Sequence, residues 1–114
     1  MSASPRDFLT DPRLFGRTDK VSWAAATPEA VAAHALLQHR FCVAVDERLR
    51  ERALTRTDLA RALDVVPATL GKKLRGHDWL QIRDMAAICL ELDAVELWPA
   101  PGSLDELRPP RTDG

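Results

Sequence analysis

The sequence has 114 residues, of which 46% are hydrophobic and 29% charged, as in a single small globular domain. Its net charge of −1 excludes a uniformly basic surface for nucleic acid. Charged residues interrupt every apolar run, which excludes a membrane-spanning segment or a signal peptide, so we expect a cytoplasmic protein. Ala, Leu and Arg are abundant and Tyr is absent, which favours helices over strands, and the predicted fold class is all-α.

Residues 1–27 contain scattered apolar side chains with no sustained period. We interpret them as an N-terminal arm that docks on the body of the protein or on a partner. Thr27 and Pro28 then have the residue types of a helix N-cap and of a first helical position. Apolar residues recur at helical spacing from there to about Arg52. This pattern predicts one long amphipathic helix, or two helices with a kink near His39.

Two short helices are predicted next in the chain. The first is capped by Thr55. The second runs over 67–74, with Pro67 in its first position and Gly76 as the glycine that follows its C-terminal end. A tight turn over 64–66 joins them. A further amphipathic helix follows, with buried positions expected at Ile82, Met85, Ile88, Cys89 and Leu92.

These elements divide the chain into three parts. The N-terminal arm over 1–27 precedes a helical domain over 28–98, whose core Leu97 and Trp98 are expected to close. Residues 99–114 are rich in proline and polar residues and are expected to form a flexible tail.

The basic residues are concentrated in one part of the chain. Between Arg48 and His77 there are eight basic and three acidic residues, a net charge of +5, which leaves −6 for the remainder. A local positive stripe on an otherwise acidic protein is what one-sided binding to a polyanion requires. A solvated helical face explains basic residues in general but not their concentration here.

The middle of the chain places two short helices and a tight turn between longer helices, which fits a helix-turn-helix. Several features occur there in register: Leu54-Thr55 at the start, the packing pair Leu59-Ala60, the inner residues Leu63, Val65 and Leu70, and the helix end Leu74-Arg75-Gly76. Together with the following helix they resemble the Xre-type, lambda-repressor-like family of DNA-binding domains, over about 45–95. The resemblance implies a bundle of about five helices with the motif at about 55–76.

The resemblance also implies which residues contact DNA. Pro67, Ala68 and Lys72 would face base edges in the major groove, where Lys72 can donate to guanine and Ala68 can touch a thymine methyl group. Other positions would meet phosphates and so orient the protein without reading sequence. These phosphate-contacting positions are Arg56, Thr69, Lys73, Arg75 and His77.

The predicted recognition helix departs from the family pattern. Val66 stands where the family has a capping Ser or Thr, and Gly71 lowers helix propensity by about 1 kcal/mol relative to alanine. Among the base-facing residues only Lys72 is a capable hydrogen-bond donor. We therefore expect sparse direct readout, with more of the affinity from phosphate contacts and DNA shape.

The sequence contains no pattern typical of a metal site or an enzyme. His39 and Cys42 share a helix face, but His34 points elsewhere and no second pair of ligands exists. Glycine-rich phosphate loops, nucleophile elbows and paired carboxylates in a plausible cleft are also absent. Cys42 and Cys89 are interpreted as reduced core thiols. No metal, no cofactor and no catalytic activity are predicted.

A homodimer is predicted, because a single module of this kind buries little surface on DNA. It would form through helix 28–52 or through the N-terminal arm. The helix carries an approximate coiled-coil seam of heptad a and d positions, interrupted by one polar residue, Gln38. The seam comprises Val31, Ala35, Gln38, Cys42, Val45 and Leu49.

The predicted function is that of a small DNA-binding transcriptional regulator of bacterial or phage type. It would bind double-stranded operator DNA through the helix over 67–74 and repress transcription by occupancy. The alternative is a protein-interaction module on the same fold with weak or no DNA reading, such as an antirepressor, an antitoxin-like partner or an adaptor. The apolar start of the helix and the acidic remainder of the chain favour that alternative.

Overall fold

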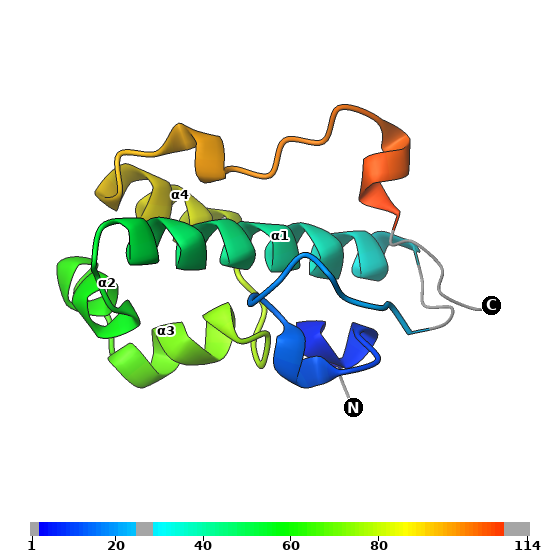
Figure 1. Cartoon of the computed structure of the whole chain (residues 1–114), viewed down its shortest axis with the longest axis horizontal. Coiled ribbons are helices and arrows are strands. Elements are labelled where there is room, and N and C mark those ends of the chain that lie inside the picture. The colour runs from blue at the N-terminus through cyan, green and yellow to red at the C-terminus, as the bar shows by residue number, and fades with distance from the viewer. Residues whose placement is uncertain (1–2, 25–28, 109–114) are drawn as a thin grey trace.

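Four α-helices carry the fold in a computed structural model, which describes residues 3–24 and 29–108 (Figure 1). They are α1 Glu29–Glu51, α2 Arg56–Ala62, α3 Pro67–Leu74 and α4 Ile82–Glu91. Four short 3-10 helices accompany them: η1 Pro5–Phe8, η2 Pro12–Leu14, η3 Val95–Leu97 and η4 Leu104–Leu107. The described residues contain no strand, only an isolated bridge, so the all-α class is confirmed. Their four α-helices are one fewer than the five or so expected.

The long helix α1 crosses the whole molecule in Figure 1, with α3 and the N-terminal segment on one side and α4 on the other. It runs over 29–51 as one helix, which settles the alternative of two helices in favour of one. Its predicted start at Thr27 and Pro28 lies outside the described residues. Its buried side chains include Ala35, Leu36, Phe41, Cys42, Val45 and Leu49.

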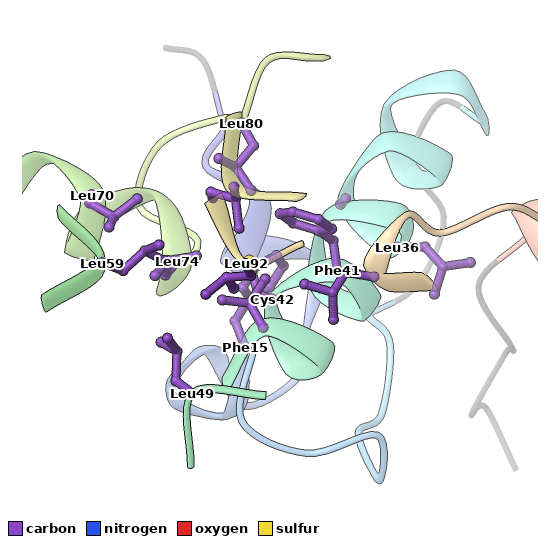
Figure 2. Packing of buried hydrophobic residues seen from close by; sticks show 14 of the residues in the cluster. Phe15, Leu36, Phe41, Cys42, Leu49, Leu59, Leu70, Leu74, Leu80 and Leu92 are labelled. Carbon is purple, nitrogen blue, oxygen red and sulfur yellow. The ribbon is translucent and has the colours of Figure 1, made fainter. Parts of the chain in front are cut away.

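The N-terminal segment is built into the core. Residues 3–24 form η1 and η2, and a bridge joins Leu9 to Trp23. Phe8, Phe15 and Trp23 are each at most 6% exposed, and Figure 2 shows Phe15 among core side chains of the α-helices. The predicted arm could dock on the body of the protein or on a partner, and in the structure it packs on the body of the protein. Such short 3-10 turns leave no helical period, so the sequence alone could not reveal it.

All four α-helices end in the same backbone motif. The residue after each helix cap has a positive φ, namely Ala53 (55°), Asp64 (57°), Gly76 (78°) and Asp93 (49°). At the end of α3, His77 N–H donates to the Lys72 carbonyl (2.8 Å) and Gly76 N–H to the Lys73 carbonyl (3.2 Å). This pair of hydrogen bonds is the Schellman motif, and the other three helix ends repeat it. The C-terminal role predicted for Gly76 is confirmed.

Ala53→Gly is expected to stabilise the protein by about 0.5–1 kcal/mol, because alanine pays a steric cost in the left-handed conformation that glycine avoids. Thermal unfolding should show a midpoint raised by about 3–5 °C. Ala62→Gly, at the last helical position of α2, is the control and should instead lower the midpoint, because glycine weakens a right-handed helix. A lowered midpoint for Ala53→Gly would contradict the positive φ at this position.

Several predicted core positions lie at the surface. Ile88, Leu92 and Leu97 are buried as predicted, but Ile82 is 74% exposed. Val65 and Trp98 are also exposed, while Met85 and Cys89 are half-buried. On α4 the apolar residues cover a wider part of the helix surface than the part that contacts the rest of the chain. Periodicity shows which side of a helix is apolar, but it does not show how much of that side other elements cover.

The predicted dimer seam is occupied by the protein's own core. Ala35, Gln38, Cys42, Val45 and Leu49 are each at most 3% exposed, and only Val31 at the start of the helix is open to solvent. Of the apolar residues of the predicted arm, Phe8, Leu9, Phe15 and Trp23 are buried as well, whereas Leu14 and Val21 are half-buried. Apart from Val31, the predicted seam positions are therefore engaged within this chain. No helix in the described part of the chain is long and apolar enough to cross a membrane.

Candidate nucleic-acid interface

Helix α3 presents one face to the core and the opposite face to solvent. Leu70 and Leu74, four residues apart, are buried against the rest of the protein. The N-terminal proline supplies no N–H and Val66 provides no side-chain cap, so the helix begins without a capping hydrogen bond. The exposed residues of this helix and its end are Pro67, Ala68, Thr69, Lys72 and Arg75. All three residues predicted to face bases are thus at the surface.

The side chain of Arg75 packs against Gly71. The Arg75 side chain, four residues later, lies back along the helix over Gly71, which is itself buried. A Cβ atom at Gly71 would stand 3.4 Å from Nη1 of Arg75, an ordinary van der Waals contact with the end of a flexible side chain. The arginine therefore lies along α3 beside Gly71 without requiring a glycine there.

A cluster of basic side chains lies around the C-terminal end of α3. The Arg6 N–H of η1 donates to the Gly76 carbonyl (3.0 Å), which brings a fourth basic residue beside Lys72, Arg75 and His77. The pKa of His77 is lowered by withdrawal of its ring from water and then by Arg6, Arg75 and Lys72, with Asp78 opposing. Sequence reasoning missed Arg6, because nothing local links residues 70 positions apart.

Two of the predicted phosphate contacts are engaged within the chain. Lys73 Nζ lies 2.9 Å from Asp84 Oδ2, and both side chains are about one-quarter exposed. Asp84 also accepts from the Gln81 N–H at the start of α4, and its pKa is lowered by this hydrogen bond and by Lys73 against the raising effect of burial. Arg56 lies 3.9 Å from Asp46 of α1. Both ion pairs join residues of different helices, so Lys73 and Arg56 are less available to a partner than exposed, unpaired side chains would be.

The predicted basic stripe is likewise only partly free. Arg48 Nη2 lies 2.6 Å from Glu96 Oε1, and Arg50 Nη2 lies 2.7 Å from Asp46 Oδ2. Half of the eight basic residues between Arg48 and His77 thus have a carboxylate partner in the chain. The other four are Arg52, Arg61, Lys72 and Arg75, and the last two lie together at the end of α3.

A buried glutamine holds that end of α3 in place. Gln38 of α1 is 1% exposed, and its Nε2 donates to the carbonyls of Lys73 (3.0 Å) and Asp78 (2.9 Å). Its Oε1 accepts from the Leu80 N–H (2.8 Å). One side chain therefore ties α1 to the end of α3 and to the loop that leads into α4. The sequence shows this residue only as a polar interruption in an apolar stripe.

The three residues weighed as metal ligands are directed to different partners. His39 is buried, and its Nδ1 accepts from the Gly16 N–H (2.9 Å); its pKa is lowered, chiefly by burial. A ring nitrogen of His34 lies 3.2 Å from the Leu80 carbonyl. Cys42 is 2% exposed and burial raises the pKa of its thiol. The described residues contain no group of three side chains suited to hold a metal ion.

Trp79 acts as a lid on the N-terminal segment. Its indole N–H donates to the Ala3 carbonyl (3.1 Å), and its ring lies 6.1 Å from that of Phe8 and 4.4 Å from that of His34, between ring centroids. This residue therefore packs within the chain and helps to hold η1, which carries Arg6, beside α3.

Comparison of the chain with protein-family models, with curated proteins and with solved structures gives no match.

Proposed function

We propose that this chain is a DNA-binding transcriptional regulator on a helix-turn-helix bundle of the lambda-repressor-like type. It places the exposed face of α3 in the major groove and represses transcription by occupying its operator. The observation that carries the proposal is the basic cluster at the end of α3, formed by Arg6, Lys72, Arg75 and His77. In the described part of the chain, Arg6, Lys72 and Arg75 have no carboxylate within ion-pair distance, so they are available to contact DNA.

The composition of the exposed face favours binding that depends mainly on the DNA backbone. Pro67 and Ala68 offer apolar contact at the start of α3, and Lys72 offers the single ammonium donor among the base-facing residues. The flanking Arg75 and Arg6 are placed for phosphate contact. Specificity would then come from one or two base contacts and from DNA shape.

Binding of a protein partner is the second candidate function. Val66 is 63% exposed and Val65 42% exposed at the turn between α2 and α3, beside the face proposed for DNA. Exposed apolar residues next to a recognition surface are typical of a protein interface. An antirepressor, antitoxin-like or adaptor role would use this turn and would not require the basic cluster.

The test is a titration of duplex DNA across a series of salt concentrations. Wild-type affinity should fall steeply with salt, and the slope of log affinity against log salt should flatten by about one in Arg75→Ala and in Arg6→Ala, while Lys72→Ala should weaken binding mainly through the lost base contact. Each lost phosphate contact should weaken binding severalfold at moderate salt. The Arg6 variant is the sharper probe, because only the folded structure brings this residue to α3.

Lys20→Ala/Arg50→Ala is the matched control, because it removes the same charge from other elements. It should leave the salt dependence nearly unchanged. The proposal fails if the wild type shows no salt-sensitive binding tighter than about 10 μM at low salt, where non-specific binders already register. It also fails if the control weakens binding as much as the variants in the cluster do.

A further inference from the structure

A buried histidine lies between α1 and the N-terminal segment. His39 is 2% exposed, and the rings of Phe15 and Trp23 meet it edge-on, at 5.2 and 5.8 Å between ring centroids. Its Nδ1 accepts from the Gly16 N–H (2.9 Å), so the proton of the neutral ring is assigned to Nε2. Within the described part of the chain, no group meets hydrogen-bond geometry with Nε2. The site therefore suits the neutral ring.

A second proton on this ring would break its contact with the N-terminal segment. It would bind at Nδ1, where the Gly16 N–H already donates, and two donors would then face each other. Burial lowers the pKa of His39, the Thr18 backbone and the Asp19 carboxylate oppose this effect, and Arg40 adds to it. Asp19 and Arg40 are the charged groups that act on the ring, one from the N-terminal segment and one from α1.

The same hydrogen bond fastens the loop over 16–21 to the helices. The other hydrogen bonds that these residues donate in the described chain go to neighbours two or three positions away. The loop packs closely on the end of α3: a Cβ atom at Gly16 would stand 2.6 Å from the Leu74 carbonyl oxygen, and one at Gly76 would stand 2.6 Å from the Phe15 ring. Release of the loop would therefore free the end of α3.

We propose that residues 16–21 form a pH-sensitive clamp on the end of α3, which opens when His39 is protonated. The pKa of this ring is lower in the closed form than the usual value of about 6.5. The clamp therefore keeps its full stability above pH 6.5 and loses stability as pH falls from there toward the lowered pKa. Regulation of DNA binding by this clamp rests on the proposed function, because the end of α3 carries Lys72 and Arg75 and holds Arg6 through Gly76.

Hydrogen exchange followed by NMR, without DNA, tests the proposal. The protection factor of the Gly16 amide should fall about tenfold between pH 7.5 and pH 5.5, because the open form binds a proton that the closed form excludes. This exchange should depend little on low concentrations of urea, since opening of a loop exposes little surface. The Leu92 amide, which donates to the Ile88 carbonyl in the core, should instead depend steeply on urea.

His39→Asn is the decisive variant, because an amide oxygen can accept from Gly16 but does not titrate. It should have similar Gly16 protection factors at the two pH values. His34→Asn, at an exposed position of the same helix, is the control and should keep the tenfold change. The titration of the His39 ring in the wild type gives a measure that does not depend on any variant folding, and its midpoint should lie below about 6.5.

A midpoint at or above this value overturns the proposal, as does a wild-type protection factor that does not change with pH. The same tenfold change in His39→Asn would also overturn it, and so would equal urea dependence at Gly16 and Leu92, because opening would then be global. Since no DNA is present, these outcomes are independent of the DNA titration. A clamp that opens in a protein without DNA binding would remove the proposed function alone.

Discussion

Gly16→Ala is expected to destabilise the protein by about 4 kcal/mol, because it combines backbone strain with a steric clash in the core. Gly16 has a φ of +74°, where an alanine side chain is strained. A Cβ atom there would also lie 2.6 Å from the Leu74 carbonyl oxygen and 2.9 Å from Cys42 Cβ. Both are fixed atoms of packed helices, so the N-terminal segment itself would have to move away. The Gly16 hydrogen bond to His39 would be lost with it.

Chemical denaturation of the variant should show a much lower midpoint, because the expected loss is a large part of the free energy of unfolding of an ordinary small domain. Gly102→Ala is the matched control, since its Cβ would meet only the flexible end of Glu106, at 3.4 Å. Its free energy of unfolding should change by less than about 0.5 kcal/mol. A loss of under about 1 kcal/mol for Gly16→Ala would show that residues 3–24 do not dock on α1 and α3 as described.

Gln38→Met is expected to cost about 3 kcal/mol, because it keeps the size of the side chain but removes three hydrogen bonds. The Leu80 N–H is left buried without an acceptor, and the Asp78 carbonyl loses its donor. The Lys73 carbonyl keeps the N–H of Gly76. Glu47→Met, on the solvent face of the same helix, should be nearly neutral in the same denaturation experiment.

Gln38→Glu adds a readout that a simple packing defect would not give. The carboxylate can still accept from Leu80, but it faces two carbonyl oxygens in a buried site, which raises its pKa in the folded state. The protonated form is then favoured by folding, so stability is retained below the unfolded pKa of about 4.3 and is lost as pH rises from there through the raised folded pKa. The variant should therefore be less damaged at pH 4 than at pH 7, relative to wild type. Equal damage at both values would contradict the hydrogen bonds assigned to Gln38.

The helices of the middle of the chain could be predicted from local signals. The helix predicted over 67–74 coincides with α3. Pro67 suits the first helical position, and Gly76 readily adopts the positive φ that follows the helix end. Few other residue types favour these two positions, so both ends could be predicted. Thr55 caps α2 as predicted, with Asp58 completing a capping box. The end of α1 at Ala53 has no such signal, and only the structure shows its left-handed residue.

The candidate site could be predicted only in part. Lys72 and Arg75 lie on the exposed face of α3 as expected, since helical spacing alone separates them from the buried leucines. Lys73 is next to them in sequence, yet it is held by Asp84, because the direction of one helix against another decides which carboxylate it meets. Arg6 joins the cluster through Gly76, a contact that no local pattern encodes.

The sequence by itself therefore determined the helical class, the bounds of α3 and the face that this helix shows to solvent. Capping, helix breaking and a 3.6-residue period act between neighbours in the chain, so they can be read without a fold. The tertiary structure alone decided that residues 3–24 belong to the core, that Gln38 serves the core and not a dimer seam, and that the outer face of α4 stays uncovered. These outcomes depend on contacts between distant residues, which exist only after the helices have docked at particular angles.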